Sequence, residues 1–492
     1  MTTTRRPFNL QTAALESMRA HGFDPEFPPS ALAQMAAMRE PSSVATPGAS
    51  VRDLRHLLWS SIDNDTSRDL DQIEVAERMP DGSTKVFVGI ADVDAFVPKH
   101  SPIDEYAARA TTTVYTGVKM FPMLPEGLST GATSLLEGQD RLSVVIEFVV
   151  DAQGRVGASD VYRAVARNQA QLTYDAVGRW LAGSGPAPAK VADSRDLQAQ
   201  LRLQDACAEA LRAERHRHGA LNIETIETHP ILSQDQEVTD VVRQQKSRAT
   251  ELIEDFMIAS NVVIARLLEA ARVSSLRRVV KAPERWDRIV DLARTLGATL
   301  PPQPDSKALN DFLTARKAAA PEHFPDLSLA VIKLLGPGEY VLERPGDPET
   351  GHFGLAVQDY THSTAPNRRF ADLVTQRLVH AVLAKAPAPY SDDELATVAR
   401  DCTQKGDAAR KVEREMSKRI AAVAMSDRIG QTFEAVVTGV TPNGTFVRVQ
   451  HPHVEGLLAR GQQGLDVGDK LRVTLVRVDV ERGYIDFGRA PS

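Results

Sequence analysis

Runs of strand-forming residues separated by turn residues predict β-structure in two parts of the chain. Glu74–Met79 and Lys85–Ala91 flank the turn sequence Pro80–Ser83, which indicates a β-hairpin. Arg141–Val150 is another run of strand formers and is followed by a second turn sequence. Between Phe433 and Phe487, five short runs of this kind follow one another. Their number and spacing are typical of a small closed barrel such as an OB fold.

Helical periodicity dominates the region from Leu172 to Met425 and also marks the start of the chain. There, Asn9 and Ser30 are each placed to cap a short helix. The two helices suit either a helix-turn-helix or a helical cap packed on the main body. We therefore predict an α+β multidomain protein with a short helical element at residues 1–50, a mixed α/β body at residues 51–428 and a five-stranded OB-fold β-barrel at residues 429–492.

Composition and charge narrow the class of protein. Hydrophobic residues make up 42% of the 492 residues and charged residues 25%, as in ordinary globular proteins. The net charge of −7 does not itself indicate a nucleic-acid partner, although local charge within a groove can still bind one. Cys207 and Cys402 lie far apart, which argues against a disulfide framework or a cysteine-based zinc site. The sequence has no secretory signal and no apolar run of about 18 residues, so we expect a cytoplasmic protein without membrane spans.

The clearest chemical signal is an acidic cluster within Ser61–Gln72. Asp63, Asp65, Asp69 and Asp71 place four carboxylates close together in the sequence. Carboxylates packed together repel one another unless a cation neutralises them, and oxygen-only ligands suit magnesium, manganese or calcium. Two magnesium ions can flank a phosphodiester, one activating water and the other stabilising the leaving oxygen. The cluster therefore predicts a metal-dependent phosphodiesterase site.

The acidic cluster also suits two roles without catalysis. A polar turn can collect aspartates for solubility alone. A calcium-binding loop that starts at Asp63 would place Glu74 at its twelfth position. However, the sixth position of such a loop requires glycine and is Arg68 here, and the flanking residues predict strands rather than helices. The calcium loop is therefore disfavoured.

Several motifs occur in the order found in the RNB catalytic domain, and together they resemble the ribonuclease II and ribonuclease R family. They are Ser61–Asp71, Val88–Val93, Phe121–Pro125, Leu252–Met257 with Asn261, His352–Leu355 and Ala365–Asp372. The C-terminal barrel resembles the RNA-binding module of the ribosomal S-one type. The resemblance covers roughly residues 51–489 and implies a catalytic domain at 51–428 and an RNA-binding domain at 429–492.

The activity that the resemblance implies is 3′→5′ exoribonuclease activity. Single-stranded RNA would enter a catalytic channel by its 3′ end and be hydrolysed to nucleoside 5′-monophosphates, with magnesium as cofactor and manganese as a substitute. By resemblance, Asp63, Asp69 and Asp71 match the acidic metal-site positions, and Gln72 occupies a fourth position of that site. Arg368 matches the arginine that holds the scissile phosphate, a role that suits a guanidinium because it can bridge two phosphate oxygens.

The resemblance also implies four RNA-binding residues. Tyr115 matches a tyrosine that stacks on bases near the 3′ end, and Tyr174 matches one that lines the terminal nucleotide pocket. Glu254 matches an acid that contacts the ribose, and Glu413 matches a later acid near the same pocket. Stacking on aromatic rings tolerates any base, and a polar group at the ribose 2′-OH can distinguish RNA from DNA.

The sequence departs from the family pattern at three points, which concern the metal site, the stacking of bases and the access of RNA to the channel. Gln72 stands where the family commonly has a fourth aspartate, so the metal site carries one charge less. Ile223 replaces a stacking phenylalanine, which leaves the base clamp to Tyr115. The first fifty residues cannot hold the family's two cold-shock barrels, so we expect RNA to reach the channel with less restriction. Gln72 also keeps open the alternative of a catalytically impaired RNA-binding protein, and a broader metal-dependent phosphoesterase is a third candidate.

Overall fold

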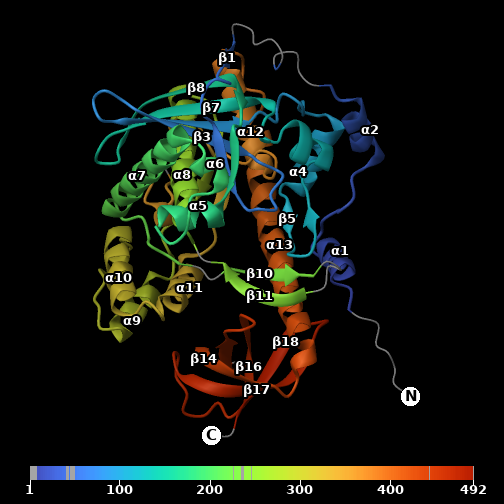
Figure 1. Ribbon diagram of the computed structural model, residues 1–492, viewed down its shortest axis with the longest axis vertical. Coiled ribbons are helices and arrows are strands. Elements are labelled where there is room, and N and C mark those ends of the chain that lie inside the picture. The colour runs from blue at the N-terminus through green and yellow to red at the C-terminus, as the bar shows by residue number, and fades with distance from the viewer. Residues whose placement is uncertain are drawn as a thin grey trace.

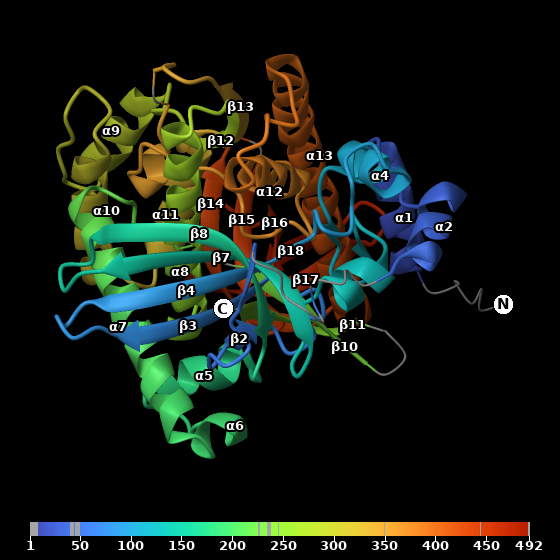
Figure 2. The same ribbon diagram turned by 90° about the horizontal axis from the view of Figure 1, so that it is seen from above.

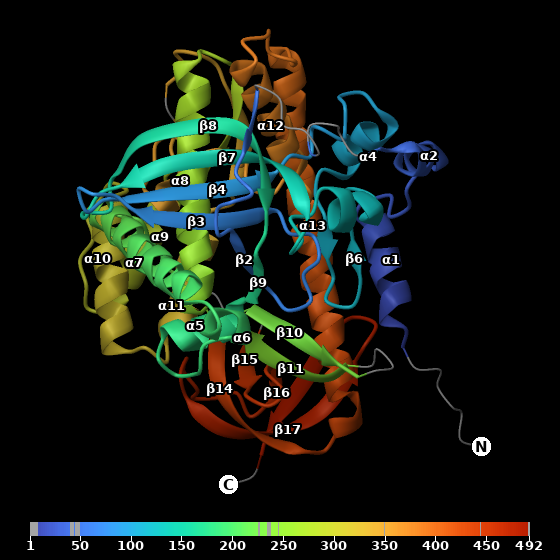
Figure 3. The same cartoon turned by 45° about the horizontal axis from the view of Figure 1, so that its top comes forward.

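A computed structural model describes residues 8–39, 44, 50–224, 227–233, 238–244, 246–348, 350–442 and 444–490. Its centre is a seven-stranded mixed sheet (Figure 3). In spatial order the strands are β1 (Val51–Asp53), β8 (Val156–Arg167), β7 (Asp140–Val150), β4 (Thr84–Ala91), β3 (Gln72–Arg78), β2 (Ser60–Asp63) and β9 (Ala170–Thr173). The two outermost strands pair in parallel with their neighbours, and the other pairs are antiparallel. The predicted hairpin is therefore confirmed as β3 and β4.

Two long helices, α7 (Arg195–Arg217) and α8 (Arg248–Ala270), pack against this sheet. Phe148 of β7 meets Phe256 of α8 edge-on, with ring centroids 6.4 Å apart, and both side chains are fully buried. This contact lies in the main core, to which α12 (Phe370–Leu383) also contributes Leu373 and Leu378. Burial of such large apolar side chains fixes the sheet and the helices relative to one another.

The longest helix, α13 (Asp392–Met425), runs from the body of the protein to the C-terminal barrel (Figure 1). Ser391 and Glu394 form a capping box at its start. The barrel is closed and consists of β14 (Thr432–Thr441), β15 (Gly444–Val449), β16 (Val454–Arg460), β18 (Tyr484–Arg489) and β17 (Lys470–Asp479) in spatial order. This arrangement confirms the predicted five-stranded barrel, and with the mixed sheet it confirms the predicted fold class.

The N-terminal helices pack on the body of the protein rather than standing apart from it. Asn9 caps α1 (Leu10–Ala20) by accepting a hydrogen bond from the Thr12 backbone, as predicted. The predicted cap at Ser30 is wrong, because Ser30 lies inside α2 (Pro29–Ala37), which begins at a proline that already has the helical φ angle. α1 packs on α13, and α2 packs on α4 (Pro102–Ala110). Most of the connector that follows α2 lies outside the described residues.

The remaining elements complete the body. A hairpin of β10 (Glu227–Leu232) and β11 (Val238–Gln244) lies between the body and the barrel (Figure 1). Helices α9 (Trp286–Thr295), α10 (Ser306–Ala319) and α11 (Phe324–Leu335) share a small core of their own and lie on the opposite side of the molecule from α1 and α2 (Figure 2). The short elements are β5 (Val114–Tyr115), β6 (Met120–Phe121), η1 (Leu128–Ala132), α5 (Tyr174–Leu181), α6 (Ala189–Ala192), β12 (Ser275–Val279), β13 (Glu339–Glu343), η2 (Phe353–Leu355) and η3 (Ser426–Arg428). None of the helices described here combines the length and the apolar character that a membrane crossing requires.

Candidate active site

The acidic segment is a loop at one end of the central sheet. β2 ends at Asp63 and β3 begins at Gln72, and because these strands are antiparallel neighbours the residues between them turn back at the same edge. Leu70 is fully buried in the middle of the segment, and its backbone N–H donates to Ser134 Oγ at 3.0 Å. The segment is therefore anchored against the core, and strands flank it instead of the helices that a calcium-binding loop requires.

Asp71 and Arg368 form the central ion pair of the site. Arg368 Nε donates to Asp71 Oδ2 at 3.0 Å, and the Asn367 backbone N–H donates to Asp71 Oδ1, also at 3.0 Å. The Asp71 side chain is completely buried, whereas that of Arg368 is 42% exposed. Burial raises the pKa of Asp71 to about 7, although Arg368 and the Asn367 N–H oppose that shift. Burial also disfavours the charged form of Arg368, but Asp71, Asp63 and Asp69 outweigh it and raise the pKa of the guanidinium.

The loop that carries Arg368 is tied down on both sides. Asn261 of α8 accepts hydrogen bonds from the backbone N–H and the hydroxyl of Ser363, at 2.9 and 2.8 Å. At the start of α12, Asp372 accepts from the Ala365 N–H at 2.8 Å and is paired with Arg369 through two hydrogen bonds of 2.7 and 2.8 Å. These contacts connect two of the sequence motifs, and they fix the backbone from which Arg368 reaches Asp71.

Tyr115 lies beside this pair and connects two predicted site residues. The residues just before it pair with the Arg368 loop, since the Thr113 N–H donates to the Arg368 carbonyl at 2.9 Å. The Tyr115 hydroxyl donates to Asp69 Oδ2 at 3.0 Å, and its backbone N–H donates to Glu413 Oε1 at 3.1 Å. Burial raises the pKa of Glu413, and the N–H of Tyr115 partly offsets that effect. The ring of Tyr115 thus stands between the acidic loop and α13, with 43% of the residue exposed.

A cavity of about 260 Å³ adjoins the ion pair. Gln72, Tyr174, Glu254 and Arg368 all contribute to its wall. Tyr174 follows β9, whose last residue pairs with Asp63, so the sheet places the tyrosine near the acidic loop. Burial raises the pKa of the Tyr174 phenol, and the negative charge of Asp63 adds to the shift. Glu254 lies on α8 and pairs with Lys246 at 2.8 Å.

Glu74 is a carboxyl group near this site whose only predicted role was in the disfavoured calcium loop. It is fully buried in β3, and neither of its carboxyl oxygens has a hydrogen-bond partner among the described residues. Burial raises its pKa well above the usual value, and the charge of Asp63 raises it further. Glu74 stands two residues after Gln72, on the same face of the strand. The two-residue spacing between Gln72 and Glu74 was the one feature of the sequence that could have indicated a further carboxyl group near the site.

Asp65 and Ile223 stand apart from the cluster. Asp65 is exposed on the turn of the acidic loop. Ile223 packs against the core of helices α9–α11. Asp63 is held within the loop by the Ser67 hydroxyl, which donates to it at 2.7 Å. As the described residues lie, no three histidine, cysteine, aspartate or glutamate side chains are close enough to share a metal ion. The metal-ligand set of Asp63, Asp69, Asp71 and Gln72 therefore stays a prediction.

Two family models match this chain. The model of the RNB domain matches residues 51–385, and the model of the RNase II-type exonuclease C-terminal S1 domain matches residues 431–490. The first match covers more than half of the chain and includes the acidic loop and Arg368. The second match corresponds closely to the closed barrel.

Curated relatives of the chain carry the name ribonuclease R. The protein from Thermotoga maritima is 30% identical over 465 residues, which cover 89% of this chain and 64% of the relative. Ribonuclease R 1 from Lactococcus lactis is 29% identical over 473 residues, covering 89% of this chain and 56% of the relative. The Escherichia coli protein is 29% identical over 515 residues, covering 97% and 62%. The chain thus spans less than two thirds of the length of these relatives.

Solved structures share the fold. The apo form of Mycoplasma genitalium RNase R has a TM-score of 0.86 at 22% identity, covering 98% of this chain and 78% of that one. The same enzyme has been solved in complex with ribose-methylated single-stranded RNA, again with a TM-score of 0.86 and the same coverage. A yeast pseudonuclease has a TM-score of 0.72 at 15% identity, covering 95% of this chain and 58% of that one.

Proposed function

Since the chain belongs to the RNB-domain family, we propose that it is a 3′→5′ exoribonuclease that hydrolyses single-stranded RNA to nucleoside 5′-monophosphates. The observation that carries this proposal is the completely buried Asp71 paired with the half-exposed Arg368 at the edge of a cavity. A carboxylate and a guanidinium in contact can serve a metal ion and a phosphate, respectively. The relatives named ribonuclease R support the same activity, and we propose RNA turnover in the cytoplasm as its setting.

Magnesium is the proposed cofactor, with manganese as a substitute. The donors available at the acidic loop are the carboxylates of Asp63, Asp69 and Asp71 and the amide oxygen of Gln72, an oxygen-only set that suits either ion. The raised pKa of Asp71 indicates that one guanidinium does not fully compensate its burial beside Asp69, so the residues present fit a further cation. When bound, the metal would activate water and stabilise charge on the leaving oxygen.

The surrounding residues would hold the RNA. Arg368 is anchored through Nε and remains exposed, so we propose that its guanidinium holds the scissile phosphate. Tyr115 presents a half-exposed ring on which a base can stack. Tyr174 and Glu254 line the cavity of about 260 Å³, where the terminal nucleotide would lie with its 2′-OH near the acid. Glu413 would hold the Tyr115 backbone in place.

The test is digestion of 5′-labelled single-stranded RNA in the presence of magnesium, with a matched DNA strand alongside. We expect stepwise shortening of the RNA from its 3′ end, release of nucleoside 5′-monophosphates and little loss of the DNA. Addition of EDTA should stop the reaction. Asp71→Asn should bind the RNA without shortening it, and Asp65→Asn is the matched control, because Asp65 lies in the same loop but is exposed. Undiminished cleavage by Asp71→Asn would refute the assignment of Asp71.

One observation favours a second candidate, an RNA-binding protein without nuclease activity. Gln72 removes a carboxylate from the acidic site, and the fold is also that of a yeast pseudonuclease. In the same assay this candidate predicts RNA that remains intact but migrates more slowly in a native gel. A broader phosphoesterase would instead degrade the DNA strand as fast as the RNA.

A further inference from the structure

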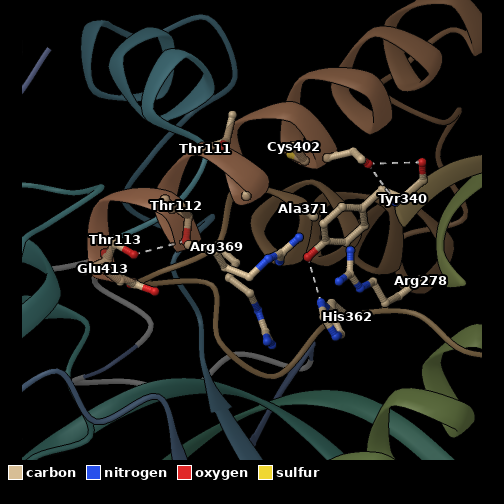
Figure 4. A pocket seen from close by; sticks show the side chains of 14 residues that line it. Thr111, Thr112, Thr113, Arg278, Tyr340, His362, Arg369, Ala371, Cys402 and Glu413 are labelled. Carbon is tan, nitrogen blue, oxygen red and sulfur yellow. Dashed lines mark hydrogen bonds between the residues drawn. The ribbon is translucent and has the colours of Figure 1, made fainter. Parts of the chain in front are cut away.

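A second cavity, of about 190 Å³, lies directly beyond the cavity that Gln72 and Arg368 line. The two cavities share Arg369 and His362 in their walls and therefore adjoin one another. The second cavity is enclosed by β12, which carries Arg278, by the loop that ends at Arg369 and by α13, which carries Arg410. Figure 4 shows Arg278, Arg369 and His362 converging on the same space.

Positive charge dominates the wall of this second cavity. Arg278, Arg369 and Arg410 contribute three guanidinium groups, and among the described residues the only acidic one in the wall is Glu413. Arg369 is paired with Asp372, which is not part of the wall. Arg410 is paired with Asp407 at the exposed surface of α13. Of the three guanidinium groups, Arg278 is therefore the one without an ionic partner among the described residues.

Arg278 is the group whose charge is least compensated. Within the described residues it forms no ion pair, and its guanidinium instead lies over the ring of Tyr340, 4.8 Å from the centroid. Burial lowers the pKa of Arg278, and the neighbouring Arg410 and Arg369 lower it further. A half-buried cation surrounded by like charges is unfavourable unless an anion is bound beside it.

A neutral hydrogen-bond donor completes the wall. Burial, together with Arg369 and Arg278, holds the pKa of His362 well below its usual value, so the imidazole is neutral at pH 7. Its Nδ1 lies 2.7 Å from the Tyr340 hydroxyl. When the phenol donates to Nδ1, the imidazole proton resides on Nε2 and can be donated to a bound oxygen.

We propose that this second cavity binds a phosphate group through Arg278, Arg369 and Arg410. Guanidinium groups match the oxygens of a phosphate in pairs, and Arg278, which has no ionic partner among the described residues, can bind one together with the two guanidiniums that are paired with Asp372 and Asp407 outside the wall. A space of about 190 Å³ accommodates a phosphate group with ordered water. The phosphate belongs either to inorganic phosphate or to the 5′-phosphate of a mononucleotide, and only the second source rests on the proposed function.

Calorimetric titration of the full chain tests the proposal. EDTA is present throughout, so that phosphate cannot bind through a metal at the acidic loop. The probes are inorganic phosphate, adenosine 5′-monophosphate and adenosine. We expect at least one phosphate-bearing probe to bind saturably and adenosine not to bind. If only inorganic phosphate binds, the ligand is the free anion. If only adenosine 5′-monophosphate binds, the ligand is the released product. Binding of adenosine as tight as that of its monophosphate, or saturable binding of neither phosphate-bearing probe, would overturn the proposal.

Matched variants locate the site. Arg278→Gln and Arg410→Gln should each weaken binding at least about tenfold, the scale of a lost charge-assisted hydrogen bond. Lys411→Gln removes the same charge from an exposed neighbour of Arg410 that does not line the cavity, and it should leave binding unchanged.

The binding test remains decisive even if one variant fails to fold, and its outcome does not depend on the proposed nuclease activity. Arg410 is exposed, so its substitution tests the site even if Arg278→Gln fails to fold. Equal weakening by Lys411→Gln and Arg410→Gln would show that only the overall charge matters and would refute the site. The titration measures binding without hydrolysis, so failure of the RNA digestion would leave this proposal standing, and failure of the titration would leave the proposed function standing.

Discussion

Replacing Asp71 with asparagine is expected to abolish RNA hydrolysis and, at the same time, to stabilise the metal-free protein at alkaline pH. The cause is the complete burial of the Asp71 carboxyl, which raises its pKa from 3.8 to about 7 despite the contact with Arg368. Asparagine has nearly the same shape, can still accept a hydrogen bond from the Asn367 N–H, and carries no charge at any pH. The variant therefore separates the chemical role of the carboxylate from its effect on stability.

The sign and size of the effect follow from proton linkage. Below pH 3.8 the group is protonated in both the folded and the unfolded chain, so its full contribution to stability is present. As the pH rises towards 7, the unfolded chain releases the proton while the folded chain retains it, and this contribution is lost. A difference of about three pKa units corresponds to about 4 kcal/mol. The folded-state pKa of about 7 already includes the attraction between Asp71 and Arg368. The value of about 4 kcal/mol therefore needs no further correction for the loss of this ion pair in the variant.

Urea denaturation in EDTA at pH 4 and pH 8 measures this difference. The free energy of unfolding of Asp71→Asn should be similar to that of the unsubstituted protein at pH 4 and exceed it by up to about 4 kcal/mol at pH 8. Asp65→Asn should show no such pH dependence, because Asp65 is exposed. At pH 8, magnesium should stabilise the unsubstituted protein and not the Asp71 variant. A variant equally destabilised at both pH values would refute the reasoning, because it would mean that Asp71 ionises in the fold without penalty.

Three further outcomes are expected. Arg368→Lys keeps the charge but not the planar fork, so kcat should fall by roughly 10²-fold in steady-state assays, and unchanged kcat would argue against phosphate contact. Tyr115→Ala removes a stacking surface that contributes about 1–3 kcal/mol per base, so the final RNA fragment on a sequencing gel should become longer while early cleavage continues. Glu74 is buried with its pKa raised well above the usual value, so burial opposes its charged form; Glu74→Gln should change the unfolding free energy by less than about 1 kcal/mol, and a larger loss in denaturation would show that the charged form contributes to stability.

Local patterns predicted most elements because the forces behind them act over short distances. The hairpin of β3 and β4 and the five barrel strands follow from runs of strand-forming residues and the turn residues between them. The cap at Asn9 was predicted correctly because its side chain bonds to the backbone three residues on. The cap at Ser30 was wrong because a serine in a capping position is outweighed by a preceding proline pair, which starts α2 at Pro29.

The site depends on contacts that no local pattern contains. Asp71 and Arg368 are 297 positions apart, and only the family resemblance placed them in one site. The burial of Glu74 was not predicted, since an antiparallel hairpin commonly has one face in water and a charged residue is expected on that face. β3 is instead an inner strand, and its first five residues are all buried, so the polar position points into the protein. The missed carboxyl group is thus a consequence of sheet order, which emerges only from the complete fold.

The structure also changes what the glutamine at position 72 implies. From sequence alone, a missing aspartate weakens the case for catalysis. In the fold, Gln72 lines the same cavity as Arg368, and Asp71 already depends on that single guanidinium to offset its burial and the charge of Asp69. A further carboxylate at this position would compete for Arg368 and raise the pKa of Asp71 above about 7. Glutamine at this position thus removes a possible carboxylate ligand of the metal but adds no charge that would oppose ionisation of Asp71, and RNA digestion distinguishes an active nuclease from an RNA-binding protein that does not cut.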